Sequence, residues 1–147
     1  MGVMSRIRNL FESKLPNPVA EQERINRDFQ SAVLQSRLGW RDPAGPIAHI
    51  GLHIVLGLMV AWNNYERRLV IELEQAMQDG RTEGDIVEIF NADLVASVAE
   101  LQKYIAGWDE GMSSPWMGVW RDGELWFRMG GPAATTWLCD RYGLSVP

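Results

Sequence analysis

The chain has 147 residues, of which 46% are hydrophobic and 22% are charged, and its net charge is −5. These proportions predict one globular domain over residues 1–147 and exclude a disordered chain. The single cysteine, Cys139, excludes an internal disulfide. The negative net charge makes direct binding to nucleic acid unfavourable, unless the arginine-bearing N-terminal part acts alone.

The N-terminal segment contains no targeting signal that we can identify. It lacks the apolar stretch and cleavage site of a secretory signal, and Arg6 stands where N-myristoylation requires Ser or Thr. We therefore expect a cytoplasmic protein. Twelve arginines against two lysines are typical of a GC-rich bacterial or phage genome.

Two helices are predicted in the first forty residues. Helical spacing of apolar residues over 5–15 predicts a short amphipathic helix, so that residues 1–16 form an element at the periphery of the domain. Asn17 and Pro18 are a typical N-cap and first helical residue, and we expect the helix that they open to end near Gly39.

The longest predicted helix runs from Pro46 to Gln78. It is apolar on all faces up to Trp62 and amphipathic beyond, which is typical of a central helix surrounded by others. A membrane span over Ala44 to Trp62 is the alternative, but this stretch is only of borderline length. Because so apolar a helix needs neighbours on every side, a homo-oligomer is also an open interpretation.

His49 and His53 would lie one turn apart on that helix, a spacing that helical metal sites use. The chain has no third histidine, and no glutamate lies near either one in sequence. We therefore predict no metal and no cofactor, and we interpret both histidines as neutral side chains that bond to neighbouring helices or line a small cavity.

The remaining predicted elements are one helix, a hairpin and a short terminal helix. A capping-box pattern at Thr82 opens an acidic helix to Ala106, within a segment (72–110) that carries ten acidic and two basic residues. Asp122-Gly123 between two alternating segments predicts a β-hairpin, and Pro132 and Gly143 delimit the last helix. The hairpin strands are predicted over Trp116 to Trp120 and Glu124 to Met129.

The expected fold class is therefore mainly α. It is a helical bundle of about three long helices with short terminal helices, and one C-terminal β-hairpin packs on it.

We expect a non-enzymatic binding protein, such as an inhibitor, an immunity-type protein or an adaptor. No catalytic signature is present, and Cys139 lies in no environment that activates a thiol, although an enzyme without a short motif stays a third alternative. An acidic helix and a tryptophan-rich hairpin suit a protein partner with a basic surface. The predicted partner-binding residues are Glu83, Asp85, Glu88, Asp93, Trp116, Trp120 and Trp126.

A small-molecule-binding protein is the alternative function. Aromatic side chains on the hairpin could form the floor of a pocket for a flat or cationic ligand. The same tryptophans could instead be core residues that hold the hairpin against the helices. The residues of the alternative pocket are Trp108, Trp116, Trp120, Trp126, His49 and His53.

Overall fold

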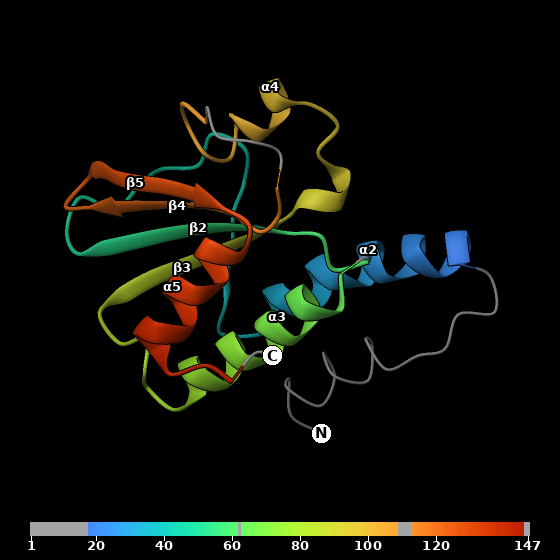
Figure 1. Cartoon of the computed structure of the whole chain (residues 1–147), viewed down its shortest axis with the longest axis horizontal. Coiled ribbons are helices and arrows are strands. Elements are labelled where there is room, and N and C mark those ends of the chain that lie inside the picture. The colour runs from blue at the N-terminus through green and yellow to red at the C-terminus, as the bar shows by residue number, and fades with distance from the viewer. Residues whose placement is uncertain (1–17, 62, 109–112, 146–147) are drawn as a thin grey trace.

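A computed structural model of the chain describes residues 18–61, 63–108 and 113–145. These residues form an α/β fold in which helices and a short irregular layer enclose a five-stranded sheet (Figure 1). The elements in chain order are α2 (Pro18–Leu34), β1 (Gly39–Trp40), β2 (Leu52–Leu58), α3 (Asn64–Gln78), β3 (Asp85–Asn91), the 3₁₀ helix η1 (Ala92–Leu94), α4 (Val98–Leu101), β4 (Trp116–Arg121), β5 (Glu124–Gly130) and α5 (Pro132–Tyr142).

The sheet is mixed, with strand order β1-β3-β2-β4-β5. β2 and β3 are parallel and α3 connects them, whereas β4 is antiparallel to β2 and to β5. β1 pairs only with the middle of β3, through Gly39 and Trp40. β2 therefore lies at the centre of the sheet, and all seven of its residues are buried.

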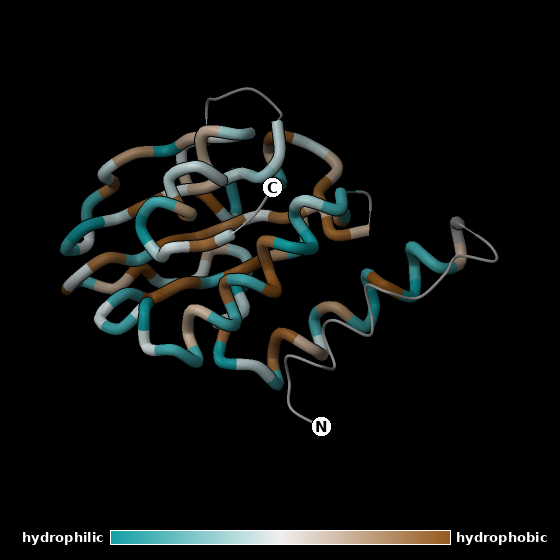
Figure 2. The backbone as a smooth tube through the Cα atoms, turned by 60° about the horizontal axis from the view of Figure 1, so that its bottom comes forward, coloured by the Kyte–Doolittle hydropathy of each residue, from teal (hydrophilic) through white to brown (hydrophobic). Residues whose placement is uncertain are grey.

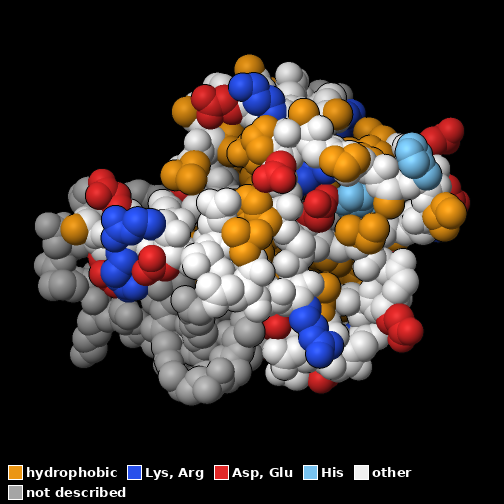
Figure 3. All heavy atoms as spheres, turned by 180° about the vertical axis from the view of Figure 1, so that it is seen from behind, with side chains coloured by type: hydrophobic (Ala, Val, Ile, Leu, Met, Phe, Trp, Pro, Cys, Tyr) orange, Lys and Arg blue, Asp and Glu red, His pale blue; other side chains and the backbone are white. Residues whose placement is uncertain are grey.

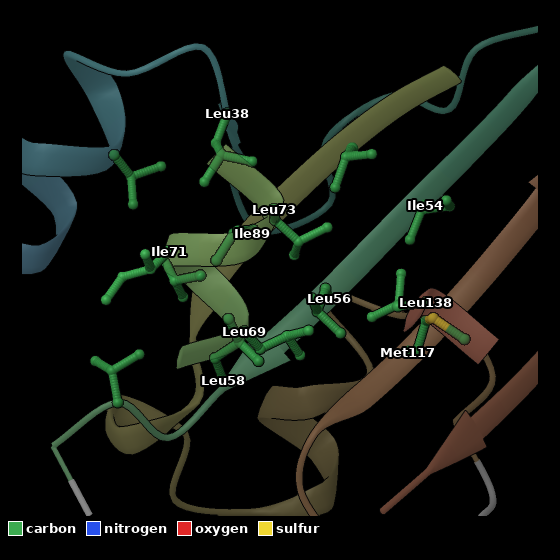
Figure 4. Packing of buried hydrophobic residues seen from close by; sticks show 14 of the residues in the cluster. Leu38, Ile54, Leu56, Leu58, Leu69, Ile71, Leu73, Ile89, Met117 and Leu138 are labelled. Carbon is green, nitrogen blue, oxygen red and sulfur yellow. The ribbon is translucent and has the colours of Figure 1, made fainter. Parts of the chain in front are cut away.

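One face of the sheet packs against α2, α3 and α5. Ile54, Leu56 and Leu58 of β2 point to this face and contact leucines of α3 and α5 (Figure 4). Hydrophobic and hydrophilic residues alternate along α2 (Figure 2), and its buried residues are Ile25, Phe29, Ala32 and Val33. This layer forms the larger of the two apolar clusters.

The opposite face is covered by η1, α4 and the segment that follows them. Val55 and Phe90 of the sheet pack here against Leu101, Ile105 and Trp108. The Phe90 ring stacks on Tyr104 with 4.3 Å between centroids. It also fills the space above its register partner Gly57, where a Cβ would lie 2.3 Å from the ring.

The expected mainly α fold is wrong, because the predicted helix Pro46 to Gln78 is strand β2 followed by helix α3. A strand that is buried on both faces has apolar residues at every position, as a fully buried helix does. The chain leaves β2 after Leu58, and Asn63 starts α3 by accepting hydrogen bonds from the N–H groups of Tyr65 and Glu66.

The expected acidic helix Thr82 to Ala106 is also wrong, because this segment contains β3, η1 and the four-residue helix α4. Ile86 and Phe90 are four residues apart, a spacing that puts both on one face of a helix but also on one face of a strand. Since β3 alternates between the two faces, its acidic residues do not share a surface.

The hairpin and the terminal helix are confirmed. β4 and β5 pair on either side of Asp122 and Gly123, both of which have positive φ. α5 follows Gly131 and ends at Gly143, whose left-handed conformation is typical of a helix C-terminus. The predicted helix 5–15 lies outside the described residues.

Within the described ranges no helix is long and apolar enough to cross a membrane. The alternative membrane span, Ala44 to Trp62, contains β2 instead of a helix.

Candidate functional site

Three segments meet at the end of the sheet that carries the β4–β5 turn, which we call the hairpin end. Asp122 accepts a hydrogen bond from the N–H of Gly51 at 2.9 Å, and its own N–H donates to the carbonyl of Gly51 at 2.9 Å. The start of β3 joins them, since a Cβ on Gly51 would lie 3.3 Å from the carbonyl oxygen of Gly84. The hairpin end therefore combines residues that are far apart in sequence.

Apolar side chains are exposed at the hairpin end. Ile86, His53, Trp120 and Leu125 are register partners across β3, β2, β4 and β5. The two inner members are buried, whereas Ile86 is 44% and Leu125 40% exposed. Ile50, in the loop before β2, is 86% exposed. In Figure 3 hydrophobic side chains surround the two histidines near one end of the molecule.

Trp126 follows Leu125 on β5 and is 47% exposed. The register between β4 and β5 shifts at this position, so that Val119 pairs with Phe127 and Trp120 with Leu125. Trp126 is the extra residue of this bulge, and bulges commonly redirect a side chain away from the ladder. The guanidinium of Arg121 lies 4.1 Å from the centroid of its ring.

The two histidines differ in environment. His49 is exposed in the loop before β2, whereas His53 is buried. Nδ1 of His53 accepts the N–H of Ala48 at 2.9 Å, so Nε2 carries the proton and donates to Oε1 of Glu88. Because both ring nitrogens of His53 are bonded to protein groups, this side chain has no free lone pair for a metal.

Glu88 also pairs with Arg41, which is only 4% exposed. The Arg41 guanidinium donates to the carbonyls of Pro46 and Tyr104 at 3.0 and 3.3 Å, and to Glu88 at 3.3 Å. This buried network holds the loop before β2 over the sheet. The carboxylate of Glu88 is therefore occupied by bonds within the chain.

Of the other acidic residues predicted to bind a partner, Glu83 and Asp85 lie at one end of β3 and Asp93 lies at the other. Glu83 is exposed in the turn before β3, at the hairpin end. Asp85 accepts hydrogen bonds from both Arg141 and Tyr142 on α5. Burial raises the pKa of Tyr142, and the hydrogen bond to Asp85 and the negative charge of Asp85 raise it further. Asp93 lies in η1 at the far end of β3.

The predicted tryptophans separate into two groups. Trp108, Trp116 and Trp120 are buried together in the cluster behind the sheet, where they are core residues. Trp126, on β5, is the one of these four predicted tryptophans that is exposed to solvent. Sequence reasoning missed Ile50, Ile86 and Leu125, because an isolated apolar residue in a sequence carries no sign that it stays exposed.

A second set of buried polar groups lies at the opposite end of the sheet, where β2 and β3 finish and α3 and α5 begin. We call this the carboxyl end. Glu66 accepts the N–H of Met59 at 3.0 Å and the hydroxyl of Ser114 at 2.8 Å. Asp93 accepts the N–H of Ala61 at 2.9 Å. These bonds fix the loop between β2 and α3.

Burial raises the pKa of Glu66, and the charge of Asp93 adds to this rise, whereas the bonds from Met59 and Ser114 oppose it. Burial also raises the pKa of Asp93, against the bond from Ala61 and the charge of Arg67. The Arg67 guanidinium donates to the carbonyls of Val60 and Ala61. Its charge therefore faces the loop.

A pocket of about 450 Å³ opens beside Glu66. It lies outside the carboxyl ends of parallel strands, where open α/β sheets commonly bind ligands. None of the described residues that line it is a tryptophan or a histidine, so it differs from the predicted tryptophan pocket. Its lining residues are Asn63, Tyr65, Glu66, Ser114, Pro115, Pro132, Thr135, Thr136 and Cys139.

Comparison of the chain with family models, curated proteins and solved structures finds no significant match.

Proposed function

We propose that this protein is a non-enzymatic binding protein that attaches to a macromolecular partner through the hairpin end. The observation that carries the proposal is the exposure there of Ile50, Ile86, Leu125 and Trp126, drawn from three separate segments. Apolar side chains held by a rigid sheet can bind without a large loss of conformational entropy. An exposed tryptophan is also the residue type that most often dominates binding energy.

The charges around this surface favour a partner with a basic rim. Glu83, Asp122 and Glu124 are exposed at the hairpin end, and the exposed arginine of the hairpin, Arg121, lies over the Trp126 ring. Asp122 is held by Gly51, and the other two acidic residues flank the apolar residues in sequence. Complementary charges of this kind accelerate association and select the partner. The protein would then act as an inhibitor or adaptor of a protein with a basic surface.

Site-specific photocrosslinking in the native host tests the proposal. We expect p-benzoylphenylalanine in place of Leu125 to give one discrete adduct. The control position is Leu34 on α2, which is 61% exposed and lies outside the hairpin end. Identical adducts from both positions, or none from Leu125, would contradict the proposal.

Charge reversal tests the acidic rim. The double variant Glu83→Lys with Glu124→Lys should weaken the crosslink from position 125 and slow association with the captured partner. Glu23→Lys with Asp28→Lys makes the same change in net charge at exposed positions of α2 and should have little effect. Equal effects of the two double variants would show that only net charge matters.

A further inference from the structure

The pocket at the carboxyl end has a lining that selects for ligand charge. Of its described lining residues, none is lysine or arginine, and one is the buried carboxyl of Glu66. The nearby Arg67 is directed to the carbonyls of Val60 and Ala61. An anionic ligand would therefore meet a carboxyl group and no cationic side chain.

The N-termini of α3 and α5 lie beside the pocket but do not supply the donors that an anionic ligand would need. At α3, the N–H groups of Tyr65 and Glu66 already donate to Asn63. At α5, Pro132 has no N–H and the N–H of Ala134 donates to the carbonyl of Gly131. The amide groups that usually bind an anion at a helix N-terminus are thus largely occupied or absent.

The groups that remain are the carboxyl of Glu66, neutral side chains that can donate or accept hydrogen bonds, and apolar surfaces. Each oxygen of Glu66 accepts one hydrogen bond and has capacity for another. The hydroxyl oxygens of Thr135 and Thr136 can accept hydrogen bonds, and two prolines, Pro115 and Pro132, line the pocket. Tyr65 is 62% exposed beside the opening, and an aromatic face attracts cations.

We propose that this pocket binds a small organic ammonium ion, with Glu66 as its counter-ion and Tyr65 at its rim. The site is separate from the hairpin end, and the inference does not depend on the proposed function. The hydroxyl groups of Thr135 and Thr136 orient the ammonium group, and Pro115 and Pro132 contact the apolar part of the ligand.

Three probes of similar shape and different charge test this inference by calorimetric titration. Benzylamine is a cation at neutral pH, benzyl alcohol is neutral and benzoate is an anion. We expect saturable binding of benzylamine, and weaker binding of benzyl alcohol by about tenfold, as expected for loss of a charge-assisted hydrogen bond. Benzoate should bind least.

Glu66→Gln should abolish the preference for benzylamine over benzyl alcohol. The amide can still accept from Met59 and bond with Ser114, so this variant should fold, which a cooperative urea transition verifies. Glu74→Gln is the matched control, because Glu74 is an equally buried acid on α3 that accepts from the N–H of Arg37, away from the pocket. Its titrations should match those of the wild type.

The inference is overturned if benzylamine shows no saturable binding, if benzoate binds as tightly, or if Glu66→Gln leaves the preference unchanged.

Discussion

The two ends of the sheet differ in the side chains that they expose to solvent. At the hairpin end, the turn residue Asp122 bonds to the backbone of Gly51, and apolar side chains stay exposed to water. At the carboxyl end, carboxyl groups are buried and bond to loop N–H groups. A two-residue turn leaves few backbone N–H and C=O groups without a hydrogen-bond partner. The connections that leave parallel strands are longer and leave more such groups to be bonded.

This difference indicates what each end can bind. Exposed apolar side chains on a rigid hairpin form a surface that suits another macromolecule. A pocket with a fixed carboxyl group instead suits a small molecule whose charge it can match. Four predictions test the comparison, from the largest expected effect to the smallest.

The largest expected effect is a difference in stability between alanine variants of two tryptophans of the hairpin. Trp120→Ala removes a ring that is 6% exposed and should lower the free energy of unfolding by about 3–5 kcal/mol. Trp126→Ala removes an exposed ring and its contact with Arg121, and should cost about 1 kcal/mol or less. Urea unfolding measures both, and equal losses would contradict the division into core and surface.

The second effect concerns Glu66 at the carboxyl end. Glu66→Leu leaves the N–H of Met59 and the hydroxyl of Ser114 without an acceptor, and should cost about 2–4 kcal/mol. Glu66→Gln keeps an acceptor and should cost less than about 1 kcal/mol. If both variants unfold at the same urea concentration, the hydrogen bonds do not hold the loop.

The third effect compares the histidines near the hairpin end. His53→Gln cannot reproduce both ring bonds and should cost about 1–2 kcal/mol. His49→Gln changes an exposed side chain and should alter the free energy of unfolding by less than about 0.5 kcal/mol. A larger loss at His49 than at His53 would reverse our assignment of the structural histidine.

The smallest effect is a pH dependence from the carboxyl end. Because the pKa values of Glu66 and Asp93 are raised above 4.5 and 3.8, the folded state retains protons that the unfolded state has released. Their contribution to stability is therefore full below these values and is lost as the pH rises through the folded-state pKa values.

Urea unfolding between about pH 4 and about pH 7 measures this contribution as the difference between wild type and the double variant Glu66→Gln with Asp93→Asn. Relative to this variant, the wild type should lose stability as the pH rises. A relative gain would show that the pKa shifts have the opposite sign.

Local signals predicted the hairpin and the last helix because the residues that determine them are adjacent. Asp122 and Gly123 form the turn, and Pro132 and Gly143 mark the limits of α5. The strands β2 and β3 could not be predicted in this way. Their identity depends on helices and loops that bury both faces of the sheet, and periodicity alone does not distinguish such a strand from a buried helix.

The candidate sites were predicted only in part for the same reason. Trp126 was predicted from its residue type, but Ile50, Ile86 and Leu125 come to the same end of the sheet only through the pairing of β3, β2, β4 and β5. Glu66 lies in a segment that was predicted as the middle of a long helix. Its contact with Ser114, 48 residues away, has no local signal.

The close approach of Phe90 to Gly57 links the evolution of two positions that are 33 residues apart. An alanine at position 57 would collide with the ring, so it is tolerated only if residue 90 becomes smaller. Homologues of this chain should therefore show a large residue at 90 only with glycine at 57. Two substitutions that are each deleterious would be neutral together, and such covariation would identify the pairing of β2 with β3 from sequences alone.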